Sequence, residues 1–221
     1  MSRFLLRARP PAPLRGVLFD MDGTLTRPGA IDFAAMRARV GAPAGVDVLA
    51  HVASFSSAAE RDALLGIIVE EEERGLQRME LADHAREVLD FLAERRVPRG
   101  LITRNNDAAM RRTVALLGRD DAFDVMLSRS FTPTKPRPEP LLHIVEKWRL
   151  EPARVAMVGD AIDDVQCARA AGAFAILIGP DAQCRYFKEA LPLADAAVAS
   201  LAELRELLAF LLDDDATAPV R

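Results

Sequence analysis

Short apolar runs recur along the chain, and stretches with helical periodicity separate them. The runs are apolar at nearly every position, without alternation, which is typical of strands that helices cover on both faces. The predicted strands span residues 16–20, 97–103, 123–128, 154–160, 174–179 and 196–200. This alternation of strands and helices predicts an α/β fold, a doubly wound parallel sheet.

The interval between Asp20 and Thr103 is too long for one connection between neighbouring strands. Three segments in it have a helical pattern: residues 31–40, 57–74 and 83–95. The last of them leads back to the second strand, so residues 28–81 are predicted to form a small helical insert after the first strand. The acidic run Glu70–Arg74 inside this insert is interpreted as a solvent-exposed helix face.

The remainder of the chain is predicted to form one core and two tails. The core comprises residues 16–27 and 82–212, and the tails comprise residues 1–15 and 213–221. The first tail is basic, free of acidic residues and rich in proline, and we expect it to be flexible. Organelle-targeting peptides share this basic, acid-poor composition, so targeting is an alternative to a cytoplasmic location. The acidic residues Asp213, Asp214 and Asp215 are interpreted as a solvated helix end.

Composition and charge exclude several classes of protein. Half of the 221 residues are hydrophobic, which is enough for a substantial core. The net charge of −4 argues against a general nucleic-acid-binding protein, because such proteins present a basic face. No apolar run approaches the roughly 18 residues of a membrane span. Cys167 and Cys184 match no metal-binding spacing, so we expect reduced thiols. The C-terminal leucines predict a docked helix and leave monomer and homodimer open.

Residues of the types that commonly bind metals or phosphate follow several of the predicted strands. They are Asp20, Asp22, Thr103, Lys135, Asp160, Asp163 and Asp164. In a parallel sheet, ligands bind at the carboxyl ends of the strands, so these side chains are expected at one edge. Each also has an ordinary structural explanation, since Thr103 could cap a helix and Asp163 could stabilise a first helical turn. Their combination at one edge favours a functional site.

Clustered carboxylates raise one another's pKa unless a cation neutralises them. Mg²⁺ binds oxygen ligands, commonly one or two carboxylates together with phosphate and water. Phosphoryl transfer also requires that the equatorial phosphate oxygens be held and neutralised. Lys135, the hydroxyl of Thr103 and backbone amides near Arg104 are the candidates for that role. The residue types therefore predict a site for Mg²⁺ and a phosphate ester.

Four motifs, in this order, resemble those of the haloacid dehalogenase superfamily of phosphohydrolases. They are DMDGTLT, LITRN, KPRPEPL and VGDAIDDVQCARAAGA, and the resemblance covers the core from residue 16 to about residue 173. It implies that Asp20 is the nucleophile and Asp22 the general acid and base. It also implies that Thr103 binds phosphate and that Lys135 steadies the nucleophile and the phosphate.

In the fourth motif, the resemblance assigns Asp160 and Asp164 to the metal site. Asp163 is the neighbour that could be confused with Asp164. The implied ligands of Mg²⁺ also include Asp20 and the backbone carbonyl of Asp22. Since members that cleave carbon–halogen bonds lack the second aspartate of the first motif, Asp22 argues against dehalogenation.

The resemblance thus implies a Mg²⁺-dependent phosphatase that acts on a small phosphorylated metabolite through an aspartyl-phosphate. The insert occupies the position of the helical cap in phosphoglycolate phosphatase-like and β-phosphoglucomutase-like members. Candidate substrate contacts are Arg27, Arg37, Arg39 and His51, although the sequence favours an exposed or satisfied surface role for each of them. A phosphotransferase or phosphomutase of the same fold and a non-catalytic binding protein are the alternatives.

Overall fold

The structure is a computed structural model that describes residues 4–46, 48–179 and 185–213. Its internal contacts divide the chain into two compact units. The helical unit is Pro28–Glu80, and the core unit is formed by the chain up to Arg27 and from Leu81 onward. Cys184, Asp214 and Asp215 lie outside the described residues.

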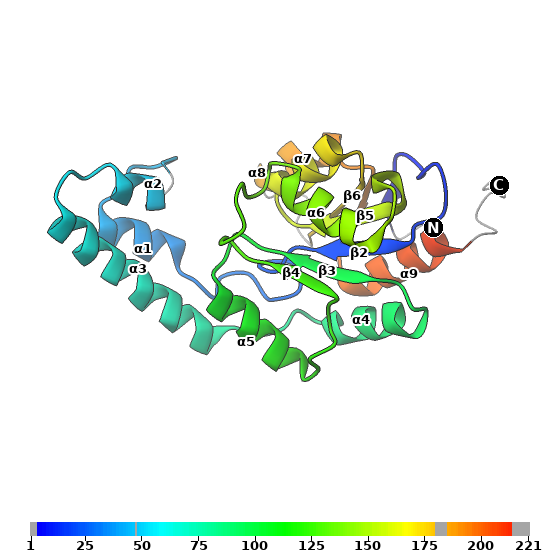
Figure 1. The fold of residues 1–221 in the computed structure, drawn as a ribbon, viewed down its shortest axis with the longest axis horizontal. Helices are drawn as coiled ribbons and strands as arrows, with labels where there is room; N and C mark the ends of the chain where they lie inside the picture. The colour runs from blue at the N-terminus through cyan, green and yellow to red at the C-terminus, as the bar shows by residue number, and fades with distance from the viewer. Residues whose placement is uncertain (1–3, 47, 180–184, 214–221) are drawn as a thin grey trace. The chain divides into compact units, whose positions relative to one another are not determined.

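Among the described residues, seven strands of the core unit form one sheet, shown in Figure 1. They are β1 (Leu5–Leu6), β2 (Gly16–Phe19), β3 (Arg99–Ile102), β4 (Val125–Leu127), β5 (Val155–Gly159), β6 (Phe174–Ile178) and β7 (Ala196–Val198). Their order is β1-β7-β6-β5-β2-β3-β4, and every neighbouring pair is parallel except β1 and β7. The predicted doubly wound α/β fold is confirmed.

Helices cover both faces of this sheet. They are α4 (Ala85–Glu94), α5 (Asp107–Leu117), α6 (Glu139–Trp148), α7 (Ile162–Ala171), α8 (Arg185–Ala190) and α9 (Leu201–Leu212), with 3₁₀ turns at Pro152–Arg154 and Leu191–Leu193. Figure 1 shows α6, α7 and α8 on one face and α4, α5 and α9 on the other. Coverage on both faces explains why β2, β3, β5 and β6 are buried at every residue.

Trp148 shows how closely the helices approach the sheet. Its ring lies over two glycines in adjacent strands, and a Cβ atom on Gly16 would lie 2.9 Å from that ring. A Cβ atom on Gly100 would lie 3.3 Å from the same ring and 2.4 Å from Leu18. The two glycines therefore make room for the indole on β2 and β3. This packing helps to fix β2, the strand whose end carries the site.

Residues 5–14 do not form the flexible tail that their composition suggests. Leu5 and Leu6 pair with β7 at Ala197 and Ala196, so they add an antiparallel edge strand to the sheet. Leu14 is fully buried, and its N–H donates to the carbonyl of Leu211 over 2.9 Å. The expected tail is wrong over these residues, because a two-residue strand is too short to show a pattern in the sequence.

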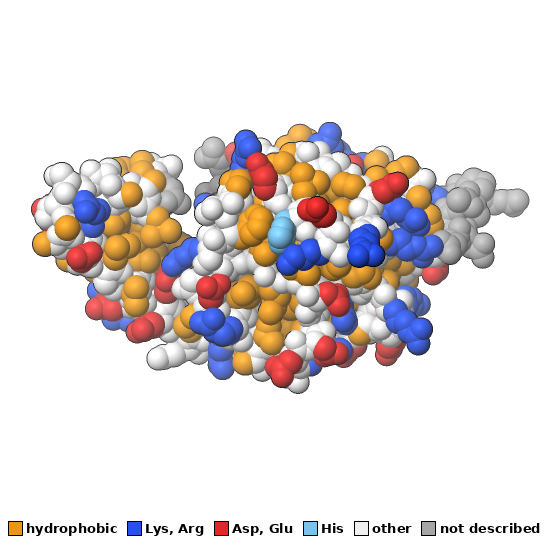
Figure 2. Space-filling view, in the orientation of Figure 1, with side chains coloured by type: hydrophobic (Ala, Val, Ile, Leu, Met, Phe, Trp, Pro, Cys, Tyr) orange, Lys and Arg blue, Asp and Glu red, His pale blue; other side chains and the backbone are white. Residues whose placement is uncertain are grey.

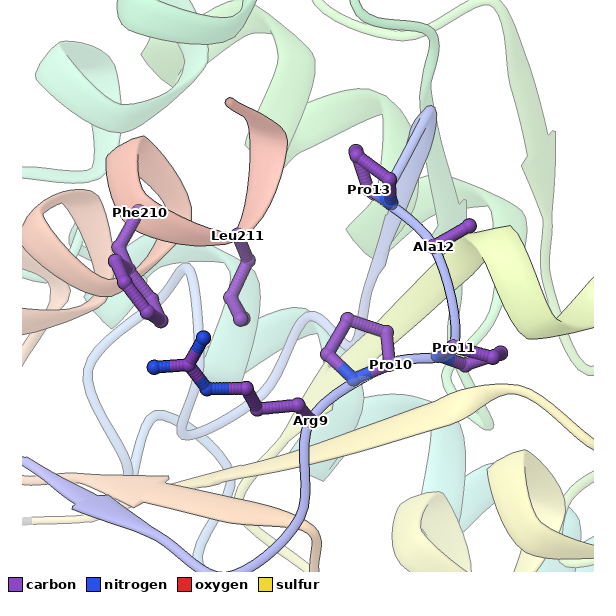
Figure 3. Close-up of a pocket in the computed structure, with 7 residues that line it drawn as sticks. All are labelled: Arg9, Pro10, Pro11, Ala12, Pro13, Phe210 and Leu211. Atoms are coloured by element: carbon purple, nitrogen blue, oxygen red, sulfur yellow. The ribbon is translucent and has the colours of Figure 1, made fainter. Parts of the chain in front are cut away.

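The prolines of the same segment lie beside α9 within the core unit. They line a small pocket together with Arg9, Phe210 and Leu211, as Figure 3 shows. The guanidinium of Arg9 lies 4.8 Å from the centre of the Phe210 ring, a cation–π contact. The segment therefore covers the C-terminal end of α9.

The helical unit consists of α1 (Phe33–Val40), α2 (Val48–Ala53) and α3 (Ala58–Arg78). Helix α2 was not predicted, since its six residues are too few to show a helical period. A small apolar core joins the three helices. Several large apolar side chains remain exposed, and Figure 2 shows apolar atoms on the surface of this unit. They are Phe33, Val46, Leu49, Leu65 and Val69.

The acidic run of α3 corrects another prediction. Glu71 and Glu72 are 3% and 9% exposed, although the run was expected to be a solvated face. A carboxylate oxygen of Glu71 accepts hydrogen bonds from Arg39 over 2.7 Å and from Arg74 over 2.8 Å. Two guanidinium groups thus compensate the burial of this charge. Among the described residues, every helix is too short or too polar to cross a lipid bilayer.

Candidate active site

Three neighbouring strands deliver polar side chains to one edge of the sheet. Strand β2 lies between β5 and β3, and all three run in the same direction. Asp20 follows β2, Thr103 follows β3 and Asp160 follows β5. Because the ends of parallel neighbours lie side by side, the sheet topology alone brings these residues together.

A tight turn follows Asp20 and directs the next residues of the chain. The N–H of Gly23 donates to the carbonyl of Thr26 over 3.0 Å, and the hydroxyl of Thr26 donates to the carbonyl of Met21 over 3.1 Å. Gly23 has a φ of +84°, a conformation that favours glycine. A Cβ atom at Gly23 would also lie 2.2 Å from a carboxylate oxygen of Asp160. The turn therefore needs glycine both for its backbone conformation and for space.

Lys135 is the buried cation of the site. Its side-chain ammonium donates to Asp20 and Asp164, each over 2.6 Å, and to the carbonyl of Ile102 over 2.8 Å. These three bonds use all of its donor capacity. Burial disfavours the ammonium, but the carboxylates of Asp164 and Asp20 outweigh that effect and raise the pKa of Lys135 above its usual range. The lysine is therefore charged at neutral pH.

Asp20, Asp160 and Asp164 form a cluster that could hold a metal ion. One carboxylate oxygen from each lies within 4.8 Å of the other two. The pKa of all three is raised, that of Asp160 to about 7 and that of Asp164 to about 6, and burial is the largest cause. Neighbouring carboxylates contribute to these shifts, and the ammonium of Lys135 opposes them. Such a cluster is stabilised by a cation, and its oxygen donors fit Mg²⁺.

The neighbouring Asp163 lies outside this cluster. Its carboxylate accepts a hydrogen bond from the guanidinium of Arg104 over 2.6 Å, at a more exposed position. The structure therefore places Asp164, and not Asp163, beside Asp20 and Lys135. The side chain of Arg104, a predicted phosphate contact, is turned toward Asp163.

The carboxylate of Asp22 is held by a different set of partners. The side-chain amide of Asn105 donates to its two oxygens over 3.1 and 3.3 Å, and the hydroxyl of Thr103 lies 3.5 Å from one of them. Burial raises the pKa of Asp22, while the bond from Asn105 opposes that shift. Its side chain is not part of the three-aspartate cluster, so any contribution to the metal site would come from its backbone carbonyl.

Asn105 was not singled out from the sequence. It stands in the LITRN motif two residues after Thr103, where polar residues before a helix are usually read as caps. The cap of α5 is in fact Asn106, whose side chain accepts from the N–H of Ala109 over 2.9 Å. Thr103 instead accepts from the N–H of Asn105 over 2.9 Å, so the interpretation of Thr103 as a helix cap is wrong.

The four candidate substrate contacts all have partners elsewhere. Arg27 forms an ion pair with Asp83, and Arg39 forms ion pairs with Glu70 and Glu71. Arg37 donates hydrogen bonds to the carbonyls of Pro43 and Val46. The ring of His51 packs edge-on against Phe55. These contacts favour structural roles for the four side chains.

Cys167 is a buried free thiol whose Sγ lies 3.2 Å from the carbonyl of Arg137, and burial is the main cause that raises its pKa to about 12.

Comparison with known proteins agrees with this geometry. The sequence model of the haloacid dehalogenase-like hydrolases matches residues 14–172. A haloacid dehalogenase-like hydrolase domain-containing protein of Arabidopsis thaliana is 38% identical over an alignment of 211 positions that covers 88% of this chain and 84% of that protein. A phosphoglycolate phosphatase of Chromobacterium violaceum is 32% identical over an alignment of 225 positions that covers 88% of this chain and 96% of that enzyme.

A solved structure shows the same fold. The crystal structure of a predicted phosphoglycolate phosphatase from Haemophilus somnus superposes with a TM-score of 0.70 at 19% identity, covering 88% of this chain and 97% of that one. The match to the family's sequence model spans strands β2 to β5, the whole helical unit and the candidate site. The chain therefore belongs to the haloacid dehalogenase-like hydrolase family.

Proposed function

We propose that this hydrolase is a Mg²⁺-dependent phosphatase that cleaves a small phosphorylated metabolite through an aspartyl-phosphate. One observation carries the proposal. The carboxylate of Asp20 accepts from the ammonium of Lys135 and clusters with Asp160 and Asp164, while the carboxylate of Asp22 lies outside this cluster and accepts from Asn105. One aspartate is thus equipped to attack, and the other is free to transfer protons. The relatives named phosphoglycolate phosphatase support the same class of substrate.

The metal would be held by residues that the structure brings together. Asp20, Asp160 and Asp164 offer oxygen ligands, and the backbone carbonyl of Asp22 is the further ligand that we propose. Bound Mg²⁺ would neutralise charge on the phosphate and on the carboxylates, so that an anion can approach an anion. Lys135 adds a fixed positive charge at Asp20 from the protein itself.

In the first step, a carboxylate oxygen of Asp20 attacks the phosphorus of the ester. A bond from Asp20 to phosphorus forms while the bond from phosphorus to the ester oxygen breaks. The departing oxygen takes a proton from the carboxylic acid of Asp22 and leaves as an alcohol. Thr103 would donate to a phosphoryl oxygen during this transfer, and the positive charge of Lys135 would stabilise the negative charge beside it.

In the second step, water hydrolyses the aspartyl-phosphate. The carboxylate of Asp22 takes a proton from the water while the water oxygen forms a bond to phosphorus, and the bond from Asp20 to phosphorus breaks. Inorganic phosphate leaves, Asp20 is again a carboxylate and Asp22 is again an acid. The two steps return the site to its starting protonation state.

Phosphate release by the purified protein tests this function. The panel should span phosphoglycolate, sugar phosphates, nucleoside monophosphates and 4-nitrophenyl phosphate, with Mg²⁺ or with a chelator. We expect release that requires Mg²⁺ and falls by at least about 1,000-fold in Asp20→Asn, because the amide cannot attack. Asp163→Asn is the matched control, since Asp163 lies outside the cluster. Full activity in Asp20→Asn would refute the proposed nucleophile.

A further inference from the structure

Asn105 makes the shortest hydrogen bond that the structure gives the carboxylate of Asp22. Its side-chain nitrogen lies 3.1 Å from one oxygen and 3.3 Å from the other, whereas the hydroxyl of Thr103 lies 3.5 Å away. The asparagine is 7% exposed, so water does not readily take its place. The orientation of Asp22 therefore depends on this amide.

Local bonds determine which way the amide of Asn105 faces. Its side-chain oxygen accepts from the N–H of Asn106 over 2.8 Å, which leaves the side-chain nitrogen directed at Asp22. Its backbone is held on both sides, since its N–H donates to Thr103 over 2.9 Å and its carbonyl accepts from the N–H of Arg129 over 2.9 Å. A flipped amide would present its oxygen to the carboxylate and lose the bond to Asn106. Asn105 is thus a rigid donor in a fixed place.

We propose that Asn105 is a positioning residue that holds Asp22 where it can protonate the leaving group. This inference rests on the proposed phosphatase function. Asn105 does not touch the reacting phosphate; it acts through Asp22 alone. It would allow the enzyme to cleave alkyl phosphates, whose alkoxide leaving groups are poor without a proton.

The leaving group provides a readout that a merely structural role would not change. An alkoxide needs the proton from Asp22, whereas 4-nitrophenolate leaves without one. The value of kcat/KM reports the steps up to the formation of the phosphoenzyme, so it isolates the first proton transfer. Partial unfolding would lower this value equally for both esters, and their ratio would not change.

The experiment compares 4-nitrophenyl phosphate with the alkyl ester of the panel that the wild type hydrolyses fastest. In Asn105→Ala we expect kcat/KM to fall about 30-fold or more for the alkyl ester and less than about threefold for the aryl ester, within the usual range of acid–base catalysis. Asn105→Ser, a smaller change that also cannot reach Asp22, should shift the ratio in the same direction. The neighbouring Asn106→Ala removes the cap of α5, and it should lower both values equally.

A double-mutant cycle completes the test. If Asn105 acts through Asp22, then Asn105→Ala should add no further shift of the ratio in an Asp22→Asn background. An equal loss for both esters, or an additive shift in the double variant, would overturn the positioning role while the phosphatase function stood. A wild type that hydrolyses neither ester would overturn both.

Discussion

Gly23 lies directly against the carboxylate of Asp160, so that a Cβ atom on the glycine would lie 2.2 Å from a carboxylate oxygen. Gly23 belongs to the turn after β2, and Asp160 follows β5, more than a hundred residues later. The turn that presents Asp20 and Asp22 is thus packed against an acid of the proposed metal site. A side chain at this glycine would disturb both at once.

We predict that Gly23→Ala lowers activity and weakens Mg²⁺ binding, each by at least tenfold, as well as lowering stability. The new methyl group must displace Asp160, and the positive φ adds roughly 1–2 kcal/mol of backbone strain. Gly118→Ala is the matched control, because Gly118 has a φ of +73° but nothing within 4 Å of its Cβ position. The control should lose stability but keep its activity. Thermal unfolding measures the stability of both variants, and phosphate release measures their activity. Equal loss of activity in both variants would contradict the steric explanation.

Lys135→Met should abolish activity and destabilise the core unit. The change removes the cation that lies 2.6 Å from both Asp20 and Asp164 and leaves two buried carboxylates uncompensated. Breaking a buried pair in this way typically costs about 3–5 kcal/mol in the free energy of unfolding. Urea denaturation would measure it, with the exposed Lys147→Met as the control. Unchanged stability in Lys135→Met would mean that the carboxylates are neutral in the folded protein.

The affinity for Mg²⁺ should rise with pH between about 5.5 and 7.5. The pKa of Asp160 is raised to about 7, so below this pH the folded protein holds a proton that the metal must displace. We expect the dissociation constant to fall about tenfold or more across this range for one displaced proton. Calorimetric titration at three pH values would measure it. An affinity that does not change with pH would contradict the assignment.

The same pKa predicts how the metal-free protein responds to pH. Asp160 binds its proton more tightly in the folded protein than in the unfolded chain. Its contribution to the free energy of unfolding therefore falls as the pH rises from about 4 to 7. Asp160→Asn removes this effect, so above pH 7 it should raise the Tm of the chelator-treated protein while it weakens Mg²⁺ binding. Asp163→Asn should leave the Mg²⁺ affinity unchanged, because Asp163 pairs with Arg104 outside the cluster.

Glu71→Ala should destabilise the helical unit, whereas Glu73→Ala should not. Glu71 is buried and accepts from both Arg39 and Arg74, while Glu73, two residues later, is exposed. Loss of the buried carboxylate leaves two donors without this acceptor, at a cost of about 1–3 kcal/mol. Chemical denaturation of the two variants provides the comparison. Equal stability of Glu71→Ala and Glu73→Ala would show that the pairing of Glu71 with the two arginines makes no net contribution to the free energy of unfolding.

The parts that could be predicted from the sequence are those with a repeated physical signal. Strands β2, β3, β5 and β6 are continuous apolar runs because helices cover both of their faces. Asp20 and Asp160 were candidates because they end such strands, and the structure brings them together with Asp164.

The missed features depend on contacts between distant residues. Strand β1 has two residues and α2 has six, so neither shows a period. The burial of Glu71 depends on Arg39, which lies 32 residues earlier on another helix. Likewise, Asn105 gains its importance from Asp22, 83 residues away. Such pairings arise only when the fold is complete.

The helical unit leaves and rejoins the core unit at one point. Thr26, at the end of the turn after β2, forms an isolated bridge with Leu81, and the N–H of Ala82 donates to the carbonyl of Leu25 over 2.9 Å. The two ends of the insertion are therefore held together next to the turn that carries Asp20 and Asp22. Because these two contacts close the insertion at its base, the turn after β2 keeps its hydrogen bonds independently of the length of chain inserted between Arg27 and Leu81.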